Sequence, residues 1–299
     1  MLTLLDFKKQ EEGIGHDIIV ENMPKTPELA VFPVYPMDGD VMTLTVQTGI
    51  PDGSFRAYNE GVTEGKGTFE NRTFTAFPLD KKISVDKALV ENKKPATVQR
   101  TLMANASAVY TGQMVRVCKQ IWEGTTKGDK KGFPGIVAQY KADDAHQVNA
   151  GDSTNKTSVY FIELGEEKVE LVTANGKTVD FYPDWKEGES TDSKGNPYEV
   201  LYNYVRGGMG LRVANRDCVV RIHSIGDGEG EGLTYQDMKT AYRKCLDLGM
   251  NPTHIFMNPR TAEQYWNLFG VDADGKVIKM PIEFMNIPFV ITPHISNAE

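Results

Sequence analysis

Residues 56–89 read RAYNEGVTEGKGTFENRTFTAFPLDKKISVDKAL, and the pattern in and around this stretch decides the fold. Residues 69–77 (FENRTFTAF) predict a strand, and residues 41–48 alternate apolar and polar side chains, which is typical of a half-buried strand. The glycine-rich segment 49–68 between them holds hardly any apolar anchor. We therefore predict a protruding two-stranded ribbon with a long loop. Such a ribbon is marginally stable alone in water, so we expect it to lie against another surface.

The strongest helical pattern of the chain follows this stretch. Apolar side chains recur every three to five residues across 96–123, Pro95 suits the start of a helix, and Gly124 suits its end. At 1.5 Å per residue this helix would form a rod roughly 40 Å long. We predict that ISVDKALVE (83–91), just before the rod, forms one short helix.

The remaining segments are predicted from their periodicity and turn residues. Residues 1–40 read as an extended arm, since prolines recur too often for a helix or a central strand. A block of strands is predicted after the rod, at 159–164, 168–172, 200–205 and 217–225. The last quarter predicts a small α/β unit with a helix capped by Thr234, a strand at 253–257, a helix capped by Asn258 and a strand at 287–292.

Composition excludes several classes of protein. The chain has 41 acidic and 33 basic residues and a net charge of −8, which argues against affinity for nucleic acid through phosphate neutralisation. Its three cysteines, at 118, 218 and 245, form no CxxC pair, so neither a disulfide scaffold nor a zinc knuckle is expected. We find no apolar run long enough to cross a bilayer and no signal peptide in MLTLLDFKKQ, and we expect an intracellular protein.

Two glycine-rich motifs suggest ligands but have the wrong spacing. In GDGEGEG (226–232), Asp227, Glu229 and Glu231 alternate like the first ligands of a calcium loop, but Met238 stands where a bidentate Glu is required. We interpret this motif as a solvated turn. GGMG (207–210) matches no nucleotide fingerprint, and a bulge or a close approach of two backbone segments is the better interpretation.

No other pattern predicts catalytic, cofactor-binding or metal-ligating residues, and we expect no enzyme. The five histidines have no ligand spacing and stand at 16, 146, 223, 254 and 294. Glycosylation sequons occur at Asn71, Asn105 and Asn155, where they mean little without secretion. The lysines at 81, 82, 87, 93 and 94 are interpreted as a solvated face. Contact with acidic surfaces of neighbouring copies, or with enclosed nucleic acid, is the alternative.

The order of these elements resembles a tailed-bacteriophage major capsid protein with the Hong Kong 97-like fold, and is similar to the shorter coat proteins of short-tailed phages and prophages. The resemblance covers nearly the whole chain and rests on order and spacing. It is carried by residues 56–89, KGFPGIV (131–137), SVYFIELGEEKVELV (158–172, as a strand pair), GMGLRVANRDCVVRIHSI (208–225), PTHIFMNPRTAEQYW (252–266) and NIPFVITPHIS (286–296).

The resemblance implies an α+β fold with named parts. These are an N-terminal arm at 1–40, an E-loop β-hairpin at 41–82, a peripheral (P) domain at 83–225 with a spine helix at 96–123, and an axial (A) domain at 226–299. In the family archetype most axial-domain sequence directly follows the spine helix. Here a strand-rich block intervenes, so a permuted strand order stays open.

The implied function is that of a structural subunit without cofactor or membrane. Copies would form pentamers and hexamers of an icosahedral capsid and enclose packaged double-stranded DNA without sequence-specific binding. A separate scaffolding protein, a portal and a cement protein would be partners. The protein would reside in the virion after assembly in the cytoplasm of a host bacterium. An encapsulin-like compartment shell is one alternative, and a soluble enzyme or β-rich binding protein with an unrecognised site is another.

Overall fold

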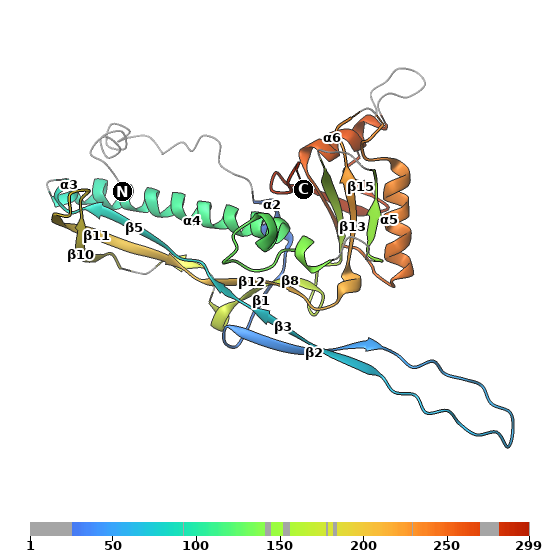
Figure 1. The fold of residues 1–299 in the computed structure, drawn as a ribbon. Helices are drawn as coiled ribbons and strands as arrows, with labels where there is room; N and C mark the ends of the chain where they lie inside the picture. Colours follow the sequence, from blue (N-terminus) through green and yellow to red (C-terminus); the bar gives the residue numbers. More distant parts are fainter. Residues whose placement is uncertain are drawn as a thin grey trace.

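The protein forms two lobes and a ribbon that projects away from both (Figure 1). Helices and strands are both abundant, which confirms the predicted α+β class. The computed structural model describes residues 26–91, 93–140, 145–151, 156–177, 179–181, 184–228, 230–269 and 281–298. Most of the predicted arm, residues 1–25, lies outside the described residues. Among the described residues, no helix combines the length and the apolar character that a membrane span requires.

The predicted rod is confirmed and forms the long axis of one lobe. Helix α4 (Pro95–Lys127) has one non-helical residue, Gly124, whose φ of 56° lies in the left-handed region, so the straight part ends where the sequence predicts. An antiparallel sheet in the order β10-β11-β5 runs along the rod, with β9 paired to β11 (Figure 1). Its strands are β5 (Lys81–Asp86), β9 (Asp180–Phe181), β10 (Lys186–Thr191) and β11 (Pro197–Arg206).

The short helix predicted over 83–91 is wrong for its first half. Residues up to Asp86 belong to β5, and only α3 (Ala88–Glu91) is helical. Ile83 and Val85 are buried on one face of the strand and pair with Asn203 and Leu201 of β11. Pairing with a distant strand therefore overrides the local helical pattern.

The two-stranded ribbon is confirmed. Strands β2 (Val41–Gly49) and β3 (Thr68–Thr75) pair antiparallel, with a register shift between Gln47 and Gly49. The ribbon emerges from a four-stranded sheet in the order β1-β8-β12-β4. The strands of this sheet are β1 (Val34–Pro36), β4 (Phe77–Pro78), β8 (Val169–Thr173) and β12 (Gly208–Val213).

The described end of the predicted arm is more ordered than expected. Pro27 occupies the start of the short helix α2 (Pro27–Val31), where the missing N–H is no loss. Strand β1 then lies at the edge of its sheet, parallel to β8, and an edge position tolerates proline. The expectation of an extended arm over 1–40 is therefore wrong for 27–31, which is helical, whereas 34–36 is extended as expected and is held by pairing with β8.

The second lobe is a six-stranded sheet in the order β15-β16-β14-β7-β13-β6, with two helices packed on it (Figure 1). The capping predictions hold: Thr234 caps α5 (Tyr235–Asp247) in a capping box with Asp237, and Asn258 caps α6 (Pro259–Asn267). The strands are β6 (Gln147–Asn149), β7 (Thr157–Ile162), β13 (Val219–Ile225), β14 (His254–Met257), β15 (Glu283–Phe284) and β16 (Ile287–Ile291). Single 3-10 turns lie at Val137–Gln139, Ala174–Gly176 and Arg216–Cys218.

The strand block after the rod is divided between the lobes. Strands β7 and β8, adjacent in the sequence and expected as a strand pair, belong to different sheets, and an isolated bridge between Leu164 and Val169 lies in the connection between them. Strands β6, β7 and β13 join the strands of the C-terminal unit in one sheet. The chain therefore crosses between the lobes several times.

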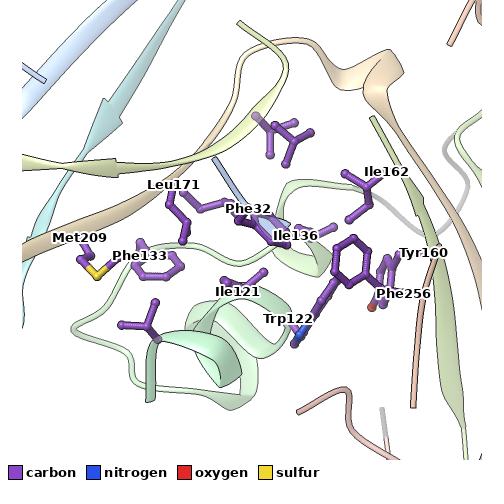
Figure 2. Packing of buried hydrophobic residues seen from close by; sticks show 14 of the residues in the cluster. Phe32, Ile121, Trp122, Phe133, Ile136, Tyr160, Ile162, Leu171, Met209 and Phe256 are labelled. Carbon is purple, nitrogen blue, oxygen red and sulfur yellow. The ribbon is translucent and has the colours of Figure 1, made fainter. Parts of the chain in front are cut away.

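A core of aromatic side chains joins the lobes around Trp122, near the end of the rod (Figure 2). Its ring centroid lies 4.9 Å from that of Tyr160 on β7 and 5.2 Å from that of Phe256 on β14. Alternate residues of β7 serve different cores, because Tyr160 faces Trp122 whereas Phe161 packs into a second core under α5 and α6. The shared strand fixes the rod against the second lobe.

Candidate assembly surfaces

The ribbon is anchored by a buried ion pair. Arg212 of β12 donates from Nε to Oε1 of Glu170 on β8 over 2.8 Å, and its Nη2 contacts the same oxygen. Both side chains are almost completely buried. The guanidinium also lies over the ring of Tyr35 on β1, 4.2 Å from the centroid. The pair therefore connects three strands of the sheet from which the ribbon emerges.

Two contacts carry this anchor into the ribbon itself. Arg212 Nη1 lies 3.2 Å from Sδ of Met42 on β2. On β3, Arg72 donates from Nη1 to the carbonyl oxygen of Ala214 over 2.9 Å. We call these residues, together with the Arg212–Glu170 pair, the ribbon root. Because both strands are held there, the position of the ribbon relative to the subunit is set at its base.

The two faces of the ribbon differ in character. On one face Thr43 and Thr73 are hydrogen-bonded at 3.1 Å, and Thr45 donates to Asn71 at 2.9 Å. On the other face the apolar side chains of β2, Met42, Leu44 and Val46, lie opposite Phe74, Arg72 and Glu70 of β3. This second face is therefore apolar along β2 and carries an Arg72–Glu70 ion pair along β3, and its apolar side chains gain stability when a second surface covers them.

Large apolar side chains at the ribbon tip, residues 50–67, are in contact with water. Ile50 is 84% exposed and Tyr58 is 99% exposed, while Phe55 is fully exposed and Val62 nearly so. Exposed apolar side chains gathered on one projecting element are typical of an interaction surface. Since this loop projects away from both lobes, neither lobe covers these side chains (Figure 1).

The lysine stretch runs from Lys81, near the second half of the rod, to Lys93 and Lys94 at its N-terminal end, and part of it is used within the subunit. Lys87 lies 3.2 Å from Glu199 and 3.3 Å from Glu187. Hydrogen bonds to these two carboxylates raise the pKa of Lys87. Lys82 lies over the ring of Tyr202, 4.6 Å from its centroid. Lys87 and Lys82 thus help to hold β10 and β11 against β5, a role that the sequence alone did not reveal.

The described histidines have separate partners and do not form one cluster, as their spacing in the sequence suggests. His146 contacts Asp217 at 2.7 Å, His223 contacts Ser224 at 2.8 Å, and burial lowers the pKa of His254. His294 faces Glu28. His16 lies outside the described residues.

The two glycine motifs behave as interpreted where the structure describes them. In 226–232, Arg260 reaches to 3.8 Å from Asp227, Gly226 donates its N–H to the carbonyl of Glu231, and Glu229 lies outside the described residues. At GGMG the backbone of Gly210 lies close to the backbone of Thr75. A Cβ on Gly210 would lie only 2.4 Å from the carbonyl oxygen of Thr75, so glycine is needed there. This contact packs β12 against the end of β3.

The cysteines and sequons have structural surroundings. All three thiols are free and buried; burial raises the pKa of Cys218 and of Cys245 to about 12, and burial and the charge of Glu28 raise the pKa of Cys118 further. Such thiols are poor nucleophiles.

Two of the three sequon asparagines have hydrogen-bond partners within the subunit. Asn71 accepts from Thr45 within the ribbon, and Asn105 donates to the carbonyl of Thr101 inside α4. Asn155 lies outside the described residues.

Sequence reasoning missed the most buried charges, Glu28, Glu170 and Arg212. Glu28 of α2 is completely buried and accepts a hydrogen bond from Trp122 at 3.0 Å. In the sequence these charges look like any solvated residue. The alternation of apolar side chains in β8 and β12 even predicts that Glu170 and Arg212 face solvent, since neighbouring residues of a strand point to opposite faces, whereas in the structure both faces of these strands are buried.

Comparison with known proteins identifies the family. Residues 32–296 match the family model of the major capsid protein GP7, which is most of the chain. The chain belongs to this family of major capsid proteins. It is therefore a structural subunit of a phage capsid shell and a component of the virion, with a non-enzymatic role. This selects the capsid over the compartment-shell and enzyme alternatives.

Solved capsid structures have the same fold. A chain in the near-atomic structure of bacteriophage Epsilon15 matches with a TM-score of 0.69 and 21% identity, over 100% of this chain and 96% of that chain. The capsid of bacteriophage JBD30 decorated with minor capsid protein trimers matches with a TM-score of 0.61 and 10% identity, over 99% and 100%. These two structural matches confirm the predicted Hong Kong 97-like architecture. The search of curated protein sequences found no match.

Proposed function

We propose that this capsid protein assembles into pentamers and hexamers that close an icosahedral shell around double-stranded DNA. The observation that carries the proposal is the ribbon, which is firmly anchored at its root and exposes Ile50, Phe55, Tyr58 and Val62 at its tip. A neighbouring copy would cover the apolar side chains of β2 and the tip. Obligate assemblies bury on the order of 2,000 Å² or more, which links folding to association.

The parts of the subunit would take the roles that the resemblance implies. Residues 1–40 would be the N-terminal arm and 41–82 the E-loop, with the rod and the β10-β11-β5 sheet as the P-domain. The sheet order supports an A-domain larger than 226–299, because β6, β7 and β13 lie in the same sheet as β14 and β16. We therefore assign the whole six-stranded lobe to the A-domain.

The charge of the subunit suits a container for DNA. The chain carries a net charge of −8, so DNA would be held by enclosure and without sequence-specific contacts. A strongly basic lining would attract DNA to the wall and oppose its movement. Lysines of the stretch at 81–94 that face a neighbouring copy would contact acidic surfaces there.

Further partners are proposed from the architecture and the comparisons. A separate scaffolding protein would guide assembly in the cytoplasm of the host bacterium, and a portal would occupy one vertex. The JBD30 capsid is described as decorated with minor capsid protein trimers. A cement protein of this kind would bind the outer surface of the present shell.

Electron microscopy of the purified protein, alone and together with its scaffolding protein, tests this proposal. Closed particles built from rings of five and six are expected. A matched variant replaces residues 50–67 by Asn-Gly, since Gly49 and Thr68 are register partners that a two-residue turn can join. This variant should fold and fail to form closed shells. Normal shells from it would refute the role of the ribbon, and a protein that stays monomeric under every condition would refute assembly.

A further inference from the structure

Three distant segments of the chain meet on the carboxylate of Glu28. Trp122 of α4 donates from Nε1 to Oε1 over 3.0 Å. Thr292 contacts the same oxygen through its hydroxyl, and His294 Nδ1 lies 3.0 Å from Oε1 and 3.2 Å from Oε2. Glu28 and Thr292 are completely buried and His294 nearly so. One side chain thus connects α2, the rod and the C-terminal segment.

The hydrogen bonds keep this buried carboxylate charged. Burial alone raises the pKa of Glu28, but hydrogen bonds from His294, Thr292 and Trp122 outweigh it and leave the pKa below its ordinary value. Cys118 of α4 faces the same carboxylate as a protonated thiol, because burial and the charge of Glu28 both raise its pKa. An ionised carboxylate with several donors is held strongly, and losing it leaves those donors buried without an acceptor.

Glu28 also lies where the N-terminal residues join the folded subunit. We call residues 26–32 the arm root, because residues 1–25 directly precede them. The arm root also makes apolar contacts with the subunit, because the ring of Phe32 packs 5.4 Å from that of Phe256 and Leu29 and Val31 pack against the same core. Inside the arm root the N–H of Phe32 donates to the carbonyl of Glu28 at 2.9 Å, so this amide reports whether α2 is intact. Glu28 thus adds a charged side-chain attachment to a segment that apolar contacts also hold.

We propose that Glu28 acts as a latch, which fixes where the arm leaves the subunit by tying the arm root to Trp122, Thr292 and His294. Opening the latch frees the arm root while both lobes stay folded, and the freed arm takes directions that closed shells do not accept. The assembly part of this proposal rests on the proposed function of residues 1–25 as an arm in the shell. The latch itself is a property of the single subunit.

A metal ion is the competing explanation for the same cluster. Ligand atoms of Glu28, Cys118 and His294 lie within 4.8 Å of one another, which is compatible with zinc. Structural zinc takes four protein ligands, however, and among the described residues the cluster offers no fourth His, Cys or carboxylate. Both Glu28 oxygens already face hydrogen-bonding partners. The geometry therefore favours the latch.

The test compares Glu28→Gln with Glu163→Gln. Glu163 is also a buried carboxylate, but it contacts Lys168 and the N–H of Asn251, away from the arm root. Hydrogen exchange would be measured on the intact subunit. Glu28→Gln should speed exchange of the Phe32 amide at least tenfold while α5 stays protected. Glu163→Gln should leave the Phe32 amide unchanged. Equal protection of that amide in wild type and Glu28→Gln would overturn the latch.

Acid opens the same latch without a mutation. The pKa of Glu28 is lower in the folded protein than its ordinary value of 4.5. The stability that the ionised carboxylate contributes is therefore complete above pH 4.5 and is lost as the pH falls through the folded pKa. Among the described residues, the titratable groups that face it are Cys118 and His294. The protection factor of the Phe32 amide, which is the intrinsic exchange rate at each pH divided by the measured rate, should fall in this acid window in the wild type, and Glu28→Gln should lack this step. A wild type without the step would overturn the latch even if Glu28→Gln fails to fold.

Two further readouts separate the alternatives. Stoichiometric zinc in the purified protein, lost in Cys118→Ser, would replace the latch by a metal site. Microscopy of Glu28→Gln should show aberrant particles or none, beside normal particles from Glu163→Gln. If the wild type forms no shells, the proposed function fails while the exchange experiment still decides the latch. Normal shells from Glu28→Gln with a freed arm root would overturn the effect on assembly.

Discussion

Arg212 and Glu170 form an ion pair inside the sheet that carries the ribbon, 2.8 Å from Nε to Oε1, with only 2% and 3% of their side chains exposed. They lie on adjacent antiparallel strands and are register partners. Tyr35 and Met42 contact the guanidinium, so the charges are enclosed by β1, β2 and their own strands.

Replacing Arg212 by Ala should strongly destabilise the subunit. The variant leaves Glu170 buried without its counter-ion, which costs about 3–5 kcal/mol in the free energy of unfolding. Chemical denaturation measures this loss. The matched control is Arg206→Ala, which removes a half-exposed ion pair with Asp80 and should cost below about 1 kcal/mol. Similar losses in both variants would mean that burial of the Arg212 pair is unimportant.

Gly124→Ala and Gly112→Ala should change stability in opposite directions. At Gly124 the backbone is left-handed and a Cβ would lie 2.1 Å from the backbone nitrogen of Gly135, so the crossing of the two segments must open. Backbone strain alone costs about 1–3 kcal/mol, and the clash adds to it, so we expect the free energy of unfolding to fall by several kcal/mol. Gly112 lies within the rod with open space around it, and Ala should stabilise by up to about 1 kcal/mol. Thermal unfolding of both variants checks the prediction.

Polar substitutions at the ribbon tip should separate folding from assembly. Phe55→Ser with Tyr58→Ser changes exposed side chains, so the stability of the subunit should stay within about 0.5 kcal/mol for each change. Shell formation, followed by light scattering and microscopy, should fall sharply. Glu64→Ser in the same exposed loop is the control and should assemble normally. Assembly at wild-type rates in the double variant would show that the tip apolar groups are not covered in the shell.

The thiols should be protected from disulfide reagents in the folded subunit. A pKa of about 12 in place of 9.0 lowers the thiolate fraction of Cys218 and Cys245 about a thousandfold at pH 8. Cys118 is shifted further in the same direction. A chromogenic disulfide reagent should therefore label the native protein slowly and all three cysteines quickly in urea. Fast labelling of one native thiol contradicts the buried positions.

Local pattern was sufficient for the elements whose causes are local. The rod between Pro95 and Gly124, the ribbon strands and the caps at Thr234 and Asn258 are all predicted from neighbouring residues, and all are present. The helix predicted over Ile83–Asp86 was wrong, because this segment forms a strand only through pairing with β11, more than a hundred residues later. The short β10 carries charged and small residues that signal no strand, and it forms through pairing with β11.

The functional surfaces were predicted only in part, for the same reason. The glycine-rich loop was found because its lack of apolar anchors is visible in one stretch of sequence. The latch and the ribbon root were not predicted, because the residues that form each of them are far apart in the sequence. Glu28 and Thr292 are separated by 264 positions, and Glu170 and Arg212 by 42. A charge destined for burial carries no mark of it in a single sequence.

The anchored ribbon also makes the subunit a lever. Gly49 at the end of β2 is seven residues beyond Met42 at the joint, so it lies about 23 Å from the joint at about 3.3 Å per residue. A rotation of about 5° at the joint then displaces the end of the strand by about 2 Å, several times the roughly 0.5 Å over which a hydrogen bond is lost. In the proposed shell, where the ribbon lies on a neighbouring copy, the torsional stiffness of the Arg212–Glu170 joint would limit how far neighbouring subunits tilt relative to each other, and with it the curvature of the shell.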